Sequence, residues 1–147
     1  MDDLLVTVIV ASHNGERFLR ETLESLFAQE FGSFEVVFVD DGSVDGTAEI
    51  AQSFPVRYLY QENAGLPAAR NAGIAVARGA FVAFLDDDDL APPDKLRVQA
   101  TYLLEHPEVG CVLGRQDWMF EEGMTPTNLQ RDSVYGELGG IPMASLM

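Results

Sequence analysis

The stretch from Phe81 to Asp89 constrains this chain most, because an apolar run of strand length ends there in four consecutive aspartates. Short apolar runs are typical of strands that are buried in a sheet. Four adjacent carboxylates repel one another and gain nothing from burial, so this strand must end at an open edge of the fold. An α/β protein can place a divalent cation at such an edge. A solvated acidic turn is the alternative, and the stretch alone leaves both open.

The charge balance narrows the partners of the protein. The 147 residues suit one domain, and 24 acids against 9 basic residues give a formal net charge of -15. Such a field repels nucleic acids and anionic membrane surfaces, so we expect neither to bind directly. It also repels a phosphate-bearing substrate, unless a cation is bound at the site.

The expected location follows from composition. The sequence contains no run of about 20 apolar residues for a membrane span, and its start lacks the basic region of a signal peptide. The single cysteine, Cys111, excludes an intramolecular disulfide and fits a reducing compartment. We therefore expect a cytoplasmic protein without a transmembrane segment, with peripheral attachment to the inner face of the membrane as an alternative for a longer form.

Hydrophobic periodicity predicts strands that alternate with helices. Short apolar runs indicate strands, and apolar residues at helical spacing indicate helices. Cys111 falls in the last predicted strand, so we expect a buried, inert thiol there. Residues 116–147 form a weakly defined tail of the same single domain, 1–147, which we expect to be truncated at its C-terminus. The predicted strands are 4–11, 34–39, 56–60, 81–85 and 109–113, and the predicted helices are 16–30, 47–52, 67–78 and 92–105.

This alternation predicts a three-layer α/β domain with a Rossmann-like, mostly parallel sheet and helices on both faces. Right-handed crossovers give the expected strand order 3-2-1-4, with a switch point between the first and fourth strands. Ligands bind outside the carboxyl ends of strands at such a point. The first, second and fourth strands end at 12–14, at 40–41 and at 86–89, so the conspicuous polar residues share one edge. A functional site is therefore favoured over unrelated solvated turns.

The acidic stretch suits a hard cation. Mg²⁺ and Mn²⁺ prefer oxygen ligands and often bind through one or two carboxylates plus substrate phosphates. If the stretch is extended, Asp86 and Asp88 point to the same side, so that one holds the metal and the other reaches a sugar hydroxyl. The metal would neutralise a diphosphate leaving group. Asp41 would accept a hydrogen bond from a base, and Arg70 either reaches toward phosphate or is a surface charge.

Five segments of the sequence carry recognisable motifs. They are V-I-V-A-S-H-N at 8–14, S-L-F-A-Q at 25–29, D-D-G-S-V-D-G-T at 40–47, N-A-G-L-P-A-A-R-N-A-G at 63–73 and F-L-D-D-D-D at 84–89. In this order and spacing they resemble the family 2 glycosyltransferases of the GT-A fold. Each motif is weak alone, but together they are strongly specific, and the resemblance covers residues 5 to about 115.

The resemblance implies a metal-dependent transferase that binds a nucleoside-diphosphate sugar, commonly a UDP-sugar, for inverting transfer to an acceptor hydroxyl. The acceptor would be a saccharide or a lipid-linked molecule in cell-envelope polysaccharide synthesis. The cofactor would be Mn²⁺ or Mg²⁺, held by Asp88 with Asp86. The implied nucleotide-binding residues are Ala11, His13, Asp41, Arg70, Asp86 and Asp87.

Within this set, the resemblance assigns the base to Asp41 and the ribose to Asp86, and it lines the base pocket with Ala11 and His13. Two positions depart from the family pattern, because Ala11 stands in place of the usual proline and His13 in place of the usual tyrosine. An imidazole is a smaller stacking platform than a phenol ring, so the identity of the base stays open.

Inverting transfer needs a general base that deprotonates the acceptor hydroxyl. The resemblance places that acid beyond the end of this sequence, and Glu121, Glu122 and Asp132 fall in predicted turns and loops. The catalytic residue is therefore unassigned, and we expect the chain as given to transfer sugar weakly or not at all.

Two other functions stay open. The first alternative is a non-catalytic nucleotide-binding module, or one that forms a homo-oligomer through apolar surface that a missing half would cover. A nucleotidyltransferase is disfavoured, because the loop after the first strand is not a basic, glycine-rich phosphate loop.

Overall fold

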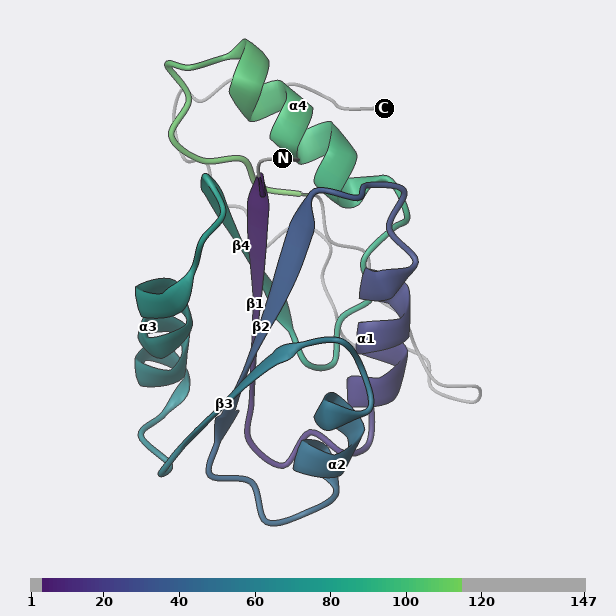
Figure 1. Cartoon of the computed structure of the whole chain (residues 1–147), viewed down its shortest axis with the longest axis vertical. Coiled ribbons are helices and arrows are strands. Elements are labelled where there is room, and N and C mark those ends of the chain that lie inside the picture. The colour runs from purple at the N-terminus through teal and green to yellow at the C-terminus, as the bar shows by residue number, and fades with distance from the viewer. Residues whose placement is uncertain (1–3, 115–147) are drawn as a thin grey trace, which may run out of the picture. The chain divides into compact units, whose positions relative to one another are not determined.

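The structure, a computed structural model, describes residues 4–114 of the chain, and strands and helices alternate along it (Figure 1). The predictions for 116–147, including those for Glu121, Glu122 and Asp132, lie outside the described residues. In chain order the elements are β1 (Val6–Ser12), α1 (Leu19–Phe27), β2 (Phe34–Asp41), α2 (Thr47–Gln52), β3 (Arg57–Gln61), α3 (Leu66–Val76), β4 (Phe81–Asp86) and α4 (Lys95–Glu105).

The four strands form one parallel sheet in the order β3-β2-β1-β4, which confirms the predicted order. β1 pairs with both β2 and β4, and all seven of its residues are buried. Valine is frequent in β1 and β2, as suits strands that are covered on both faces. Within residues 4–114, β4 has a partner strand only on the β1 side, so it forms an edge of the sheet.

Helices cover both faces of the sheet, as predicted, and the alternation of side chains along β1 sorts the core into two clusters. Val8 and Val10 pack in a cluster with residues of α1, α2 and α4. Ile9 and Ala11 pack with Ala69 of α3 in the other. Figure 1 shows α3 on one side of the sheet and α1 and α2 on the other. The three-layer α/β fold is therefore confirmed.

Two expectations about the end of the described chain are wrong. Residues 109–113 form no strand, and Cys111 is exposed. A strand needs a neighbour that exchanges backbone hydrogen bonds with it, and a short apolar run does not show whether one is present. Helix starts also differ, because residues 16–18 form a turn before α1 begins at Leu19, and α4 begins only at Lys95.

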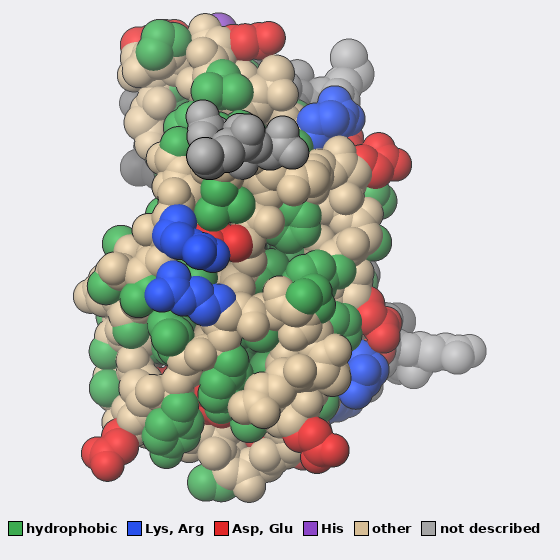
Figure 2. Space-filling model, viewed as in Figure 1, with side chains coloured by type: hydrophobic (Ala, Val, Ile, Leu, Met, Phe, Trp, Pro, Cys, Tyr) green, Lys and Arg blue, Asp and Glu red, His purple; other side chains and the backbone are tan. Residues whose placement is uncertain are grey.

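A polar cluster at the amino ends of the strands fixes the connection from α3 to β4. Thr7 Oγ1 donates to Glu35 Oε1 over 2.8 Å and accepts the N–H groups of Arg78 and Gly79. Glu35 Oε2 accepts hydrogen bonds from the Arg78 guanidinium. A Cβ at Gly79 would lie 2.5 Å from the Thr7 nitrogen, so the close approach requires glycine. Figure 2 shows basic side chains beside an acidic one near the C-terminal end of α3.

Burial raises the pKa of the Glu35 carboxyl, but hydrogen bonds from Arg78 and Thr7 outweigh burial and hold the pKa below its usual value. We expect Glu35→Gln to lower the free energy of unfolding by about 1 to 2 kcal/mol at neutral pH. A depressed folded-state pKa gives stabilisation that is present above the unfolded pKa and is lost as the pH falls through the folded pKa. In urea unfolding, the difference from wild type should therefore shrink as the pH falls below the unperturbed value of 4.5.

Glu24→Gln, on the exposed side of α1, is the control for loss of one carboxylate. It should leave stability almost unchanged at every pH. A Glu35→Gln effect that does not vary with pH would show that the charge of Glu35 does not stabilise the cluster.

Candidate functional site

The carboxyl ends of β1, β2 and β4 meet at one edge of the sheet. In the strand register Ser12 lies beside Asp40 of β2, and Ala11 lies beside Asp86 of β4. The three polar segments that follow these strands are therefore neighbours, as the strand order predicts. Two pockets open at this edge, and His13 lines both.

The smaller pocket, of about 60 Å³, lies between the ends of β1 and β2 and the start of α3. It brings together Ala11, His13 and Asp41, three of the predicted nucleotide-binding residues. Sequence reasoning did not place Leu66 at the site, although the match of residues 63–73 to a known motif carried the signal. The complete lining is Ala11, Ser12, His13, Asp41, Leu66 and Ala69.

The Asp41 side chain is 4% exposed, and its carboxylate is already hydrogen-bonded. Oδ1 accepts from Gln61 Nε2 over 2.6 Å and from the Ala64 N–H over 2.9 Å, and Oδ2 accepts from the Gly65 N–H over 2.8 Å. Burial raises the pKa of this carboxyl, but the bonds outweigh burial and hold the pKa below its usual value. A carboxylate has about four acceptor positions. Asp41 thus fixes the segment before α3 and keeps capacity for a further donor.

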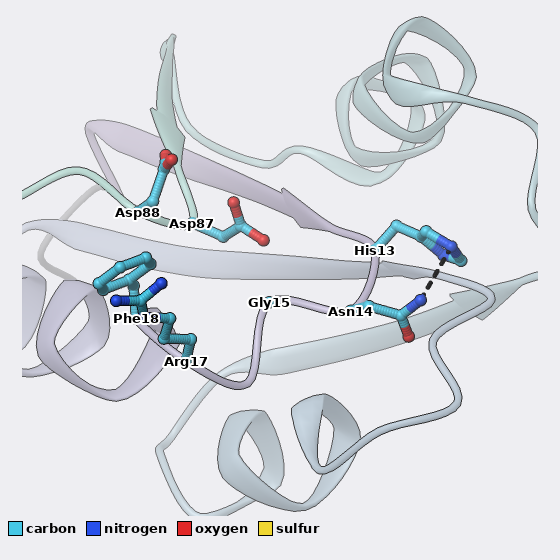
Figure 3. Close-up of a pocket in the computed structure, with 7 residues that line it drawn as sticks. All are labelled: His13, Asn14, Gly15, Arg17, Phe18, Asp87 and Asp88. Carbon is cyan, nitrogen blue, oxygen red and sulfur yellow. Dashed lines mark hydrogen bonds between the residues drawn. The ribbon is translucent and has the colours of Figure 1, made fainter.

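His13 stands at the exposed rim between the two pockets. Its Nδ1 lies 2.8 Å from the backbone oxygen of Asp41, and the amide nitrogen of Asn63 lies 3.1 Å from the ring. Figure 3 shows the ring beside Asn14, whose amide nitrogen lies 3.1 Å from Nε2. These contacts hold the imidazole in place. Sequence reasoning placed Asn14 at this edge but assigned a role to neither asparagine.

The four acids 86–89 form a tight turn, the acid turn, and not an extended segment. β4 ends at Asp86, and the Asp89 N–H donates to the Asp86 backbone oxygen over 3.2 Å. The expectation that side-chain alternation places Asp86 and Asp88 on one side is therefore wrong, because no strand ladder keeps the chain extended beyond Asp86. Asp87 and Asp88 instead line the larger pocket together.

The larger pocket, of about 280 Å³, is bounded by the loop after β1 and by the acid turn (Figure 3). Asp87 points toward the Gly15 side of this pocket and accepts a hydrogen bond from Ser12 Oγ, a partner that sequence reasoning missed. A Cβ at Gly15 would collide with the Asp87 carboxylate, so glycine permits the close approach. The rest of the wall is His13, Asn14, Arg17, Phe18 and Asp88.

Charge repulsion is concentrated in the acid turn. Burial raises the pKa of Asp87 despite the hydrogen bond from Ser12, and the charge of Asp88 adds to the rise. Burial and the charges of Asp86 and Asp88 also raise the pKa of Asp89. The Asp88 carboxylate is exposed and makes no hydrogen bond or ion pair within the described part of the chain. A bound cation would relieve this repulsion.

Arg70 of α3 lies directly beside the acid turn. Its guanidinium pairs with Asp86 Oδ1 over 2.6 Å and lies 5.4 Å from the centroid of the Phe84 ring. Arg70 is therefore not an isolated surface charge. Its contact with phosphate stays a prediction.

The residues fit a hard cation that is held partly by substrate. Among residues 4–114, no group of three or more His, Cys, Asp or Glu side chains is arranged to hold a metal ion. Mg²⁺, however, usually binds through one or two carboxylates and completes its shell with water and phosphate oxygens. The exposed carboxylate of Asp88 is a suitable oxygen ligand, whereas Asp86 would share its carboxylate with Arg70.

A parallel sheet of this order, with a pocket and a turn of acids at its carboxyl edge, defines an α/β domain of the GT-A type. The chain belongs to glycosyl transferase family 2, because the model of that family matches residues 7–139.

Individual relatives agree with the family. Glycosyltransferase GlyA of Streptococcus pneumoniae is 36% identical over 135 residues, which cover 88% of this chain and 19% of GlyA. The uncharacterized glycosyltransferase YibD of Escherichia coli is 38% identical over 122 residues, which cover 80% of this chain and 35% of YibD. The chain thus spans about a third or less of the length of these relatives.

Solved structures share the fold. S. aureus TarS in complex with UDP-GlcNAc matches with a TM-score of 0.65 and 35% identity, over 70% of this chain and 32% of that one. Mannosyltransferase PcManGT from Pyrobaculum calidifontis, in complex with GDP-Man and Mn²⁺, matches with a TM-score of 0.61 and 31% identity, over 71% of this chain and 33% of that one.

In the part of this chain that the structure describes, none of the helices has the length and apolar character to cross a membrane.

We expect Asp41→Asn to loosen the segment before α3, because an amide NH₂ would face N–H donors that now meet a carboxylate oxygen. The free energy of unfolding should fall by about 1 to 3 kcal/mol. The depressed folded-state pKa means that the difference from wild type is full above the unperturbed value of 3.8 and shrinks as the pH falls below it. Amide hydrogen exchange of Ala64 and Gly65 should be faster than in wild type, and unchanged protection of these two amides would contradict the assignment.

Proposed function

We propose that this chain is the donor-binding part of an inverting glycosyltransferase and binds a nucleoside-diphosphate sugar together with Mn²⁺ or Mg²⁺. One observation carries the proposal: the small pocket around Ala11 lies next to the acid turn, because Ala11 pairs in register with Asp86. A ligand with a flat base at one end and a diphosphate at the other fits this adjacency.

The small pocket suits the base. His13 stands at its rim, and the remaining acceptor position of Asp41 would take a base N–H. UDP-GlcNAc is the ligand in the TarS complex and GDP-Man in the PcManGT complex, which supports a nucleoside-diphosphate sugar as the class. Within that class we propose a UDP-sugar, because the family motifs that this chain shares are commonly linked to that donor.

The acid turn suits the diphosphate end. Asp86 pairs in register with Ala11, which lines the small pocket, and would contact the ribose. Asp88 would hold the cation. The Mn²⁺ in the PcManGT complex supports a divalent cation of this kind. When bound, the cation neutralises the diphosphate leaving group. Arg70, already at Asp86, would add positive charge near the phosphates, and Asp87 would position the turn through Ser12.

In the proposed reaction the acceptor hydroxyl attacks the anomeric carbon, the bond from that carbon to the diphosphate oxygen breaks, and the configuration inverts. A general base must take the hydroxyl proton. We assign that role to no residue of the described part, so the chain as given is expected to transfer sugar weakly or not at all. The proposed acceptor is a saccharide or a lipid-linked molecule of the cell envelope, reached from the cytoplasmic side.

Asp88→Ala tests the metal site. Wild type should bind UDP more tightly with Mn²⁺ than without it in calorimetric titrations, and GDP and dTDP titrated in the same way would identify the base. In the variant, the Mn²⁺-dependent gain in affinity should be at least about tenfold smaller. Even the loss of a group that only orients a metal ligand has an effect of that size. Its metal-free affinity for UDP should not fall, because the change removes a negative charge that repels the diphosphate.

Asp94→Ala is the matched control, because Asp94 is an acid at the start of α4 whose side chain makes no capping hydrogen bond. It removes the same charge and should keep the Mn²⁺-dependent gain. Equal losses in both variants would show that the Mn²⁺-dependent gain reflects the general negative charge of this edge and not a metal ligand at Asp88. A wild-type chain with no metal-dependent affinity for any of the three nucleotides would refute the proposed function.

A self-associating module is the second candidate, and the exposed edge of the sheet favours it. Val82 and Phe84 of β4 are 39% and 44% exposed, and an edge strand of this kind invites pairing with a second copy. Sedimentation velocity should then show a dimer that forms with rising concentration. Val82→Lys should abolish it and Leu104→Lys, at an exposed residue of α4, should not. A wild-type monomer at every concentration would exclude this candidate.

A further inference from the structure

The segment that carries the acids leaves the sheet and runs beside α1 (Figure 1). β4 ends at Asp86 and α4 begins at Lys95, so no ladder or helix holds the residues between them. The carboxylates of the acid turn repel one another. The backbone N–H and C=O groups of the segment nevertheless need partners wherever water is excluded. Side chains of α1 supply several of these partners.

Two hydroxyl groups of α1 contact the segment directly. Thr22 Oγ1 donates to the backbone oxygen of Asp87 over 2.9 Å. The Ala91 N–H donates to Ser25 Oγ over 3.0 Å, and Ser25 Oγ donates in turn to the Thr22 backbone oxygen over 2.8 Å. Residues three apart in a helix share a face, so both hydroxyls point the same way.

Gln29, just beyond the end of α1, extends this row. Its Nε2 donates to the backbone oxygens of Ala91 and Pro92, and its Oε1 accepts the Leu96 N–H over 3.0 Å. One amide side chain therefore holds the end of the segment and the first turn of α4. We call Thr22, Ser25 and Gln29 the α1 polar stripe.

Thr22 and two of the residues that the stripe contacts are sheltered from water, whereas Ser25 and Gln29 are partly exposed. Thr22 is 0% exposed, Ala91 5% and Leu96 2%. A hydrogen bond in a sheltered site contributes more than one in water, and its loss leaves a buried group without a partner. The stripe therefore holds the segment firmly, although the acids themselves are mostly exposed.

We propose that the α1 polar stripe holds the acid turn in the conformation that receives the divalent cation. The role of the cation rests on the proposed function. That the stripe fixes the conformation of the acid turn rests on the hydrogen bonds alone. Thr22 and Ser25 are positioning residues, because they contact the backbone of the segment and not a ligand. A turn that is ordered before binding loses less entropy when the cation arrives, so the stripe raises metal affinity. This gives the S-L-F-A-Q motif at 25–29 a physical role.

Thr22→Val tests the hold, because it removes the hydroxyl and keeps the shape of the side chain. The Asp89 and Ala91 amides should exchange with solvent about fivefold faster, the effect of one lost hydrogen bond. Thr7→Val is the matched control: Thr7 is equally buried and hydrogen-bonded, but it lies at the opposite edge of the sheet. It should leave these two amides unchanged.

Ser25→Ala and Ser25→Thr form a second pair, which keeps the test decisive if Thr22→Val does not fold. The alanine variant should speed exchange of the Ala91 amide, and the threonine variant, which keeps the hydroxyl, should restore protection. Unchanged exchange in both Thr22→Val and Ser25→Ala would overturn the proposal.

Titration of UDP with and without Mn²⁺ tests the consequence for the metal. Thr22→Val should lower the Mn²⁺-dependent gain in affinity by about fivefold and leave the metal-free affinity unchanged. An equal loss in Thr7→Val would point to general destabilisation and overturn the link to the metal. A wild-type chain without any Mn²⁺-dependent gain would refute the proposed function, and hydrogen exchange would then decide the hold of the stripe by itself.

Discussion

Repulsion among the four carboxylates of the acid turn is the constraint to which the rest of the site responds. Near a protein surface, where the effective dielectric constant is about 20, two unit charges about 4 Å apart interact by about 4 kcal/mol. The fold offsets part of this repulsion, because Ser12 donates to Asp87 and Arg70 pairs with Asp86. Asp88 is left without such a partner in the described part of the chain, which is why this carboxylate is the one suited to a metal.

Aspartates at the end of β2 have the opposite character from those at the end of β4. Asp40 is 1% exposed, and its carboxylate accepts the Tyr58 hydroxyl over 2.6 Å and the Ser43 N–H over 2.8 Å. Burial and the Asp40 charge raise the pKa of Tyr58, so the hydroxyl stays protonated as a donor. The buried acids of β2 therefore hold loops in place through these bonds, while Asp86, Asp88 and Asp89 at the end of β4 are exposed. The same residue type has two roles because the partners differ.

Sequence reasoning reached the fold and the gathering of polar residues at one edge of the sheet for physical reasons. Short apolar runs that alternate with helical patterns predict a parallel sheet, and parallel connections bring the carboxyl ends of its strands together, so the residues after β1, β2 and β4 were expected to meet. The shape of the acid turn was not predictable, because its contacts come from a distant part of the chain: Thr22 donates to the Asp87 backbone oxygen, and Ser25 accepts the Ala91 N–H just beyond the turn. For the same reason the engagement of Asp41 with the segment before α3 is visible only in the structure.

If the proposed donor binds at this edge, the net charge of the chain favours a cation beside the phosphates of the donor. The formal net charge is -15, and Arg70 already pairs with Asp86. Lys95 lies close enough to Asp89 for the two charges to interact, although burial lowers the pKa of the lysine. The positive charges of Arg70 and Lys95 therefore both interact with acids of the turn. A diphosphate that approached this edge without a metal would meet more negative than positive charge, and so its affinity should depend on the divalent ion far more than on any single basic side chain.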